Sequence, residues 1–140
     1  MNLIIDTNVL VSALMSDSGA SREVIRRCLA KRYQPFISMA LFTEYRNVMG
    51  RHSLFEGCIF PADKRRALFA AFASVCRKTE IYYLWRPNLR DEGDSHVVEL
   101  AIAAAAKAVV THNVSDFVRT ELRFPALRVL TPAQLLKEDV

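Results

Sequence analysis

Short apolar runs alternate along the chain with segments whose apolar residues recur every three or four positions. The first run, at residues 2–5, predicts a buried strand, and Val9, Leu10, Ala13 and Leu14 predict that a helix follows at once. The same pattern predicts strands over residues 35–37, 80–83, 108–111 and 128–130, and helices over about 20–31, 39–50, 62–77, 94–106 and 114–119 and from Pro132 onward. This alternation favours an α/β fold in which helices cover both faces of a parallel sheet.

The size and composition of the chain predict one domain. With 140 residues, of which 51% are hydrophobic, the chain is expected to form a single domain over residues 1–140. No apolar run reaches membrane-spanning length and the first residues lack a signal-peptide pattern, so a cytoplasmic protein without membrane association is expected. The three cysteines form no CxxC pair, which favours buried structural thiols over disulfides or a zinc site.

The net charge of +4 permits an anionic partner but does not require one. Basic residues cluster within residues 22–32, 64–66 and 77–78, whereas several acidic residues stand nearly alone. Such basic clusters are either solvated helix faces or contacts to phosphates around an acidic site.

Four acidic residues stand at positions where α/β proteins place chemistry. Asp6 ends the first strand at a turn into a helix, Asp94 is expected to cap a helix, and Asp116 follows the fourth strand. Helix capping explains each of these three taken alone. Capping does not explain Glu44, which lies at the edge of the apolar stripe of its helix and therefore needs a partner. Glu99 falls opposite the apolar positions of its helix and is expected to be solvated.

These acidic residues are expected to meet at one edge of the sheet, because the carboxyl ends of parallel strands lie together. Carboxylates in one pocket repel each other, and without a counter-charge their pKa values rise. A hard divalent cation removes this conflict, and carboxylate oxygens are ligands that Mg²⁺ or Mn²⁺ accepts. Such a site activates water and neutralises charge on a phosphodiester.

The chain resembles the PIN-domain family, and in particular the VapC-like toxin components of bacterial toxin–antitoxin pairs. The matching segments are residues 5–10, Glu44, residues 91–94 before an Ala-rich helix, and residues 110–117. The resemblance implies a three-layer α/β/α fold with a parallel sheet of about five strands in the order 3-2-1-4-5. It also implies a Mg²⁺- or Mn²⁺-dependent endoribonuclease, usually a homodimer, which an antitoxin protein inhibits.

The resemblance implies roles for particular residues. Asp6, Glu44 and Asp94 would form the core acidic triad and metal site, with Asp116 as the fourth acidic residue. Ser95 departs from the family pattern; Asp94 is chosen because it starts the helix, and whether Asp91 or Glu92 shares its role stays open. Orienting hydrogen bonds would come from Thr7, Asn8, Thr111 and Asn113. The basic clusters, and not the resemblance, supply the candidates for contacts to the RNA backbone, which are Arg22, Arg26, Lys64 and Arg65. Candidates for the dimer face are Phe55, Phe60 and Trp85, for which core packing is the competing interpretation.

Two other functions compete with the nuclease hypothesis. The first is a non-catalytic module with a PIN-like fold that binds RNA or protein without cleaving it. The second is a phosphoryl-transfer enzyme of the dehalogenase-like kind, which also uses an aspartate after the first strand. That chemistry needs a second acidic residue two positions later, where this chain has Asn8. His112 is interpreted as a solvated loop histidine, with a phosphate contact as the alternative.

Overall fold

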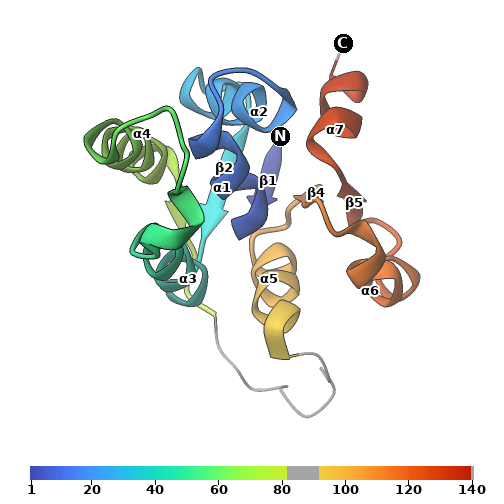
Figure 1. Cartoon of the computed structure of the whole chain (residues 1–140). Helices are drawn as coiled ribbons and strands as arrows, with labels where there is room; N and C mark the ends of the chain where they lie inside the picture. Colours follow the sequence, from blue (N-terminus) through green and yellow to red (C-terminus); the bar gives the residue numbers. More distant parts are fainter. Residues whose placement is uncertain (82–91, 140) are drawn as a thin grey trace.

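The protein is described by a computed structural model, which covers residues 1–81 and 92–139 except for the side chains of residues 92–95, Arg119 and Leu122. Figure 1 shows the arrangement of its elements. The strands are β1 (Asn2–Ile5), β2 (Gln34–Ile37), β3 (Arg77–Lys78), β4 (Ala108–Val110) and β5 (Arg128–Leu130). The α-helices are α1 (Thr7–Met15), α2 (Ala20–Leu29), α3 (Met39–Met49), α4 (Ala62–Val75), α5 (Glu92–Ala103), α6 (Val118–Arg123) and α7 (Pro132–Glu138). Two short 3₁₀ helices are η1 (His52–Phe55) and η3 (Val114–Phe117).

The strands of the described residues form one sheet in the order β3-β2-β1-β4-β5, which confirms the predicted fold class. Every pairing is parallel, and Ile5 at the end of β1 lies opposite Val110 at the end of β4. The strand order reverses beside β1, because β2 lies on one side of it and β4 on the other. Figure 1 shows α3 and α4 towards the β2 side and α6 and α7 towards the β5 side. The edge where β1 and β4 end is therefore the switch point at which open α/β sheets bind ligands.

The core lies between the sheet and its helices. The residues of β1 from Leu3 to Ile5 and all of β4 are buried, which agrees with their uninterrupted apolar sequence. Helix α5 packs on β1 and β4, whereas α1 contacts α2, α3 and α4. Within the described residues, no helix combines the length and apolar character needed to cross a membrane. The three cysteines are free thiols; Cys28 is buried as predicted, whereas Cys58 and Cys76 are only half-buried.

Two predicted elements are wrong in position. The third strand was expected over residues 80–83, but β3 is Arg77–Lys78, and both of its residues are exposed. An exposed edge strand carries polar side chains, so apolar periodicity does not reveal it. Helix α5 begins at Glu92, two residues before the predicted cap, so Asp94 lies inside its first turn. Residues 82 and 83 of the predicted strand lie outside the described residues.

Two predictions about exposure are also wrong. Glu99 is half-buried, because α5 contacts both the sheet and α3. Its Oε2 atom is buried and has no hydrogen-bond partner among the described residues. Phe55, a candidate for a dimer face, is buried under the guanidinium of Arg65, which lies 4.5 Å from its ring centre. Phe60 is half-buried, and Trp85 lies outside the described residues.

Candidate active site

Asp6 joins β1 to α1 and is both a helix cap and a buried charge. Its backbone N–H donates to the carbonyl of Val110 at 2.9 Å, which extends the pairing of β1 with β4 by one residue. One carboxylate oxygen accepts from the backbone N–H of Thr7 at 2.9 Å, and the other accepts from the Thr111 hydroxyl at 2.7 Å. The residue is 8% exposed, and this burial raises the pKa of its carboxyl despite the lowering effect of the hydrogen bonds.

Glu44 reaches this site from α3. Its Oε1 atom accepts from the Thr7 hydroxyl at 2.8 Å, and its Oε2 atom contacts Nε2 of His96 at 2.7 Å. The hydrogen bond from His96 is the main reason why the pKa of Glu44 is lowered, and the negative charge of Glu44 contributes to the raised pKa of Asp6. The two carboxylates therefore share one electrostatic environment, and their pKa values are shifted in opposite directions.

A network of neutral donors surrounds the ends of β1 and β4. The Asn8 side-chain amide donates to the Thr111 hydroxyl oxygen at 3.3 Å and to the second carboxylate oxygen of Asp6 at 3.5 Å. The side-chain oxygen of Asn8, Oδ1, accepts from the backbone N–H of His112 at 3.1 Å. Asn113 contributes its backbone N–H, which donates to Thr111 at 3.1 Å. The structure thus joins three of the four predicted supporting residues directly to Asp6 or Glu44, and it joins the fourth, Asn113, to Thr111.

No described contact joins the other predicted acidic residues to Asp6 or Glu44. Asp94 lies in the first turn of α5, and its side chain is outside the described part of the structure. Asp91 and the side chain of Glu92 are likewise outside it. Asp116 lies in η3 and is exposed, and its backbone N–H donates to the Asn113 carbonyl at 3.0 Å. The described side chains therefore bring together Asp6 and Glu44 only.

The sequence pattern did not predict a role for His96. The residue lies four positions before Leu100, which is buried in α5, and residues at that spacing share one face of a helix. Its side chain is only 14% exposed. The signal that could have revealed His96 is its position on the inward face of α5. A helix that starts at Asp94 or Ser95 puts His96 in its first turn, where helix ends fray, so the residue did not stand out.

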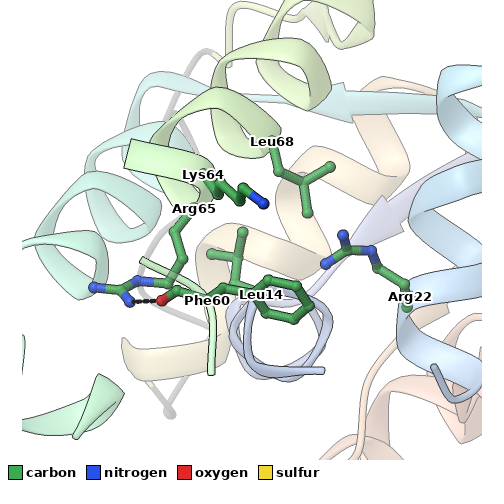
Figure 2. Close-up of a pocket in the computed structure, with 6 residues that line it drawn as sticks. All are labelled: Leu14, Arg22, Phe60, Lys64, Arg65 and Leu68. Carbon is green, nitrogen blue, oxygen red and sulfur yellow. Dashed lines mark hydrogen bonds between the residues drawn. The ribbon is translucent and has the colours of Figure 1, made fainter. Parts of the chain in front are cut away.

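Three of the four basic residues predicted to contact RNA line one pocket of about 210 Å³. Figure 2 shows Arg22 from α2 across the pocket from Lys64 of α4. The Arg22 guanidinium donates to the Ala13 carbonyl at 2.8 Å, and that of Arg65 donates to the Phe60 carbonyl at 2.6 Å. The remaining lining residues are Leu14, Phe60 and Leu68, so no acidic side chain of the described residues lines the pocket.

The fourth residue, Arg26, is directed elsewhere. It pairs with Glu23 one helical turn away, with 2.7 Å between the guanidinium nitrogen and the carboxylate oxygen. Among the described residues, the side chain of Lys64 has no hydrogen bond or ion pair, so its ammonium group is available to an anion.

The donor atoms at the switch point suit a hard cation, because they are carboxylate and hydroxyl oxygens without a nearby thiolate. Within the described side chains, no group of three or more His, Cys, Asp or Glu residues is placed to hold a metal ion. Asp6 and Glu44 supply two acidic residues, and Asp94 stands on the helix that also supplies His96. The feature that fits a cation is the buried Asp6 carboxylate, whose hydrogen bonds come from neutral groups.

A parallel sheet in the order 3-2-1-4-5 with acidic residues at its switch point is the arrangement expected of a PIN-type protein. The model of the PIN domain matches residues 2–115, and the chain belongs to this family. PIN domains are typically nucleases, which supports a hydrolase at this coarse level.

The chain is also similar in fold to a solved structure. A chain of VapBC2 from Rickettsia felis, solved bound to a DNA fragment from their promoter, matches with a TM-score of 0.59 and 18% identity. The match covers 92% of this chain and 97% of that one. A search of curated proteins gives no match.

Proposed function

We propose that this protein is a metal-dependent endoribonuclease that hydrolyses RNA phosphodiester bonds and acts as the toxin of a toxin–antitoxin pair. One observation carries the proposal: at the switch point of a PIN-domain sheet, the Asp6 carboxylate is buried among neutral donors, with Glu44 sharing its environment. Burial without a cationic partner disfavours the charge of this carboxylate, and a bound cation would stabilise that charge.

The proposed metal ligands are Asp6, Glu44, Asp94 and Asp116, for Mg²⁺ or Mn²⁺. A bound divalent cation would supply an activated water and would stabilise negative charge on the scissile phosphate. Thr111 and the Thr7 backbone N–H hold the two oxygens of Asp6 in place. The Thr7 hydroxyl holds Glu44, so one residue links both carboxylates. This shared support keeps the two acidic side chains in a fixed relative orientation before substrate arrives.

The RNA backbone is proposed to run from the acidic edge towards the pocket that contains Lys64. Leu14, which lines that pocket, lies on α1, whose first residue touches both carboxylates. A helix rises about 1.5 Å per residue, so Leu14 lies roughly 10 Å along α1 from Thr7. Phosphate contacts at this distance would position the strand and carry little sequence information.

An antitoxin protein is the proposed inhibitor, and a homodimer is the proposed assembly. The support for an antitoxin is the similarity in fold to a chain of a VapBC2 complex. Co-purification of the chain with the product of a neighbouring reading frame, followed by measurement of RNA cleavage with and without that product, tests the first proposal. Light scattering on the purified chain tests the second.

The decisive experiment for the nuclease is cleavage of a mixed RNA pool by metal-stripped protein. Cleavage should be absent after chelation and should return when Mg²⁺ or Mn²⁺ is added. Asp94→Asn should lose the activity that metal restores. Cleavage that resists chelation, or that survives this substitution in clean protein, contradicts the mechanism. If wild-type protein binds RNA tightly but never cleaves it, the chain is instead a non-catalytic RNA-binding module.

A further inference from the structure

His96 contacts an acidic residue of the proposed site yet belongs to none of the segments that mark the family resemblance. Its Nε2 atom lies 2.7 Å from Oε2 of Glu44 and connects α5 to α3. An ionised carboxylate only accepts hydrogen bonds, so Nε2 must carry the hydrogen. The ring nitrogen Nδ1 is buried and has no hydrogen-bond partner among the described residues. The hydrogen bond to Glu44 is therefore the one polar contact that the described structure gives this side chain.

The carboxylate of Glu44 is held by hydrogen bonds from two different helices. The Thr7 hydroxyl donates to Oε1 from α1, next to Asp6, and His96 donates to Oε2 from α5, two residues after Asp94. A carboxylate offers about four lone-pair positions, so two remain after these bonds. Both oxygens are thereby fixed while each keeps one position for a further ligand.

Without the bond from His96, Glu44 would keep a single anchor. A glutamate side chain that is 38% exposed has several rotamers available, and one hydrogen bond to Thr7 does not select among them as strongly as two. Residues that orient a metal ligand through a hydrogen bond change metal affinity or activity by about 10–100-fold when they are removed.

We propose that His96 is a positioning residue, whose Nε2–H fixes the orientation of the Glu44 carboxylate for binding a divalent cation. This inference rests on the proposed function, because it assigns Glu44 to a metal site. His96 itself is not a catalytic residue in this account, since Nε2 is occupied by Glu44 and Nδ1 is buried. The role depends on where the donor lies, not on the imidazole ring.

Two amide variants of His96 separate donor position from ring chemistry. The amide nitrogen of a glutamine lies near the position of imidazole Nε2. The side chain of asparagine is about one bond shorter, so its amide nitrogen lies near the position of Nδ1. His96→Gln should therefore keep the bond to Glu44, and His96→Asn should lose it. His52, an exposed residue of η1, provides the matched control His52→Asn.

The experiment is calorimetric titration of Mn²⁺ into metal-stripped protein, with melting temperatures to verify folding. We expect Mn²⁺ affinity to fall about 10-fold or more in His96→Asn and to stay within about 3-fold of wild type in His96→Gln and His52→Asn. Equal affinity in His96→Asn and wild type overturns the role of His96, and so does equal weakening by both amides. If wild-type protein binds no Mn²⁺, the proposed function itself fails, which is a distinct result.

Discussion

Two carboxylates of this protein lie in opposite electrostatic settings. Asp139, which follows α7, accepts at one oxygen from Arg27 at 2.9 Å, Arg32 at 3.1 Å and the Tyr33 hydroxyl at 2.8 Å. These contacts, led by the one from Tyr33, lower the pKa of Asp139. Among the described residues, Asp6 has hydrogen bonds only from neutral donors, and burial raises its pKa.

The comparison separates a structural charge from a functional one. The chain supplies its own cations to Asp139, so this carboxylate joins α7 to α2 and needs nothing from outside. At Asp6 the chain supplies hydrogen bonds that hold a geometry but leave the charge uncompensated. Buried charges that lack a partner within the protein are typical of functional sites, where a bound ligand neutralises them.

The largest difference between the two carboxylates should appear in RNA cleavage. We predict that Asp6→Asn lowers the Mn²⁺-dependent cleavage rate on the order of 10³-fold or more, because it removes a charged metal ligand. Asp139→Asn should leave the rate within about 2-fold of wild type, since surface ion pairs contribute little. Steady-state cleavage of one labelled RNA measures both. A similar loss in both variants would mean that damage to the fold explains it.

The second prediction concerns stability, where the two substitutions should act in opposite directions. Asp6→Asn removes a buried charge and keeps an acceptor suited to the helix cap, so the melting temperature of metal-free protein should rise by a few degrees. Asp139→Asn should lower the melting temperature slightly, because Arg27 and Arg32 lose their anionic partner. Thermal denaturation after chelation measures both shifts. A clear fall in the melting temperature of Asp6→Asn would contradict this, because it would show that the carboxylate stabilises the metal-free fold.

A smaller effect is expected at the basic pocket. Lys64→Gln should weaken RNA binding about 3–10-fold and reduce the salt dependence of the binding constant by roughly one unit of slope, because one phosphate contact is lost. Lys107→Gln is the matched control, since this exposed lysine precedes β4 at the opposite edge of the sheet. Filter binding to a catalytically inactive Asp6→Asn background at several salt concentrations measures the effect. Equal losses in both lysine variants would argue for a diffuse charge effect.

The smallest expected effect is the pH dependence of the contribution that Asp139 makes to the stability of the fold. Its pKa is lower in the folded protein than in the unfolded chain, so its stabilising effect is present above the unfolded value of about 3.9 and is lost as the pH falls through the folded pKa. Wild type and Asp139→Asn should therefore differ in melting temperature at neutral pH and converge at low pH. A difference that persists after full protonation would point to packing in place of charge.

Much of the fold followed from the sequence because local patterns determine it. The apolar residues 3–5 could only be buried, and Asp6 had to stand at the end of that strand. Glu44 was identified from its place at the edge of an apolar stripe, and the structure gives it the partners that such a position requires. Strand β3 was misplaced, because its two exposed residues carry no apolar signal and the apolar residues lie farther along the chain.

The parts that sequence could not predict depend on contacts between distant segments. His96 meets Glu44 across 52 positions of sequence, and no local pattern encodes that pairing. Arg22 and Arg65 were predicted as phosphate contacts from charge alone, but backbone carbonyls already engage both guanidinium groups. In sequence, Lys64 does not differ from these two arginines as a basic residue. The three-dimensional arrangement distinguishes it from them, because its side chain lines the same pocket without a bond to a backbone carbonyl of the described residues.

The central claim is that a divalent cation neutralises the charge of Asp6, whereas Arg27 and Arg32 of the chain itself neutralise that of Asp139. Calorimetric titration of Mn²⁺ into metal-stripped wild type, Asp6→Asn and Asp139→Asn tests it directly. The account predicts saturable binding to wild type and to Asp139→Asn with the same affinity, and no measurable binding to Asp6→Asn. Wild-type affinity in Asp6→Asn, or the absence of binding to wild type, would contradict it.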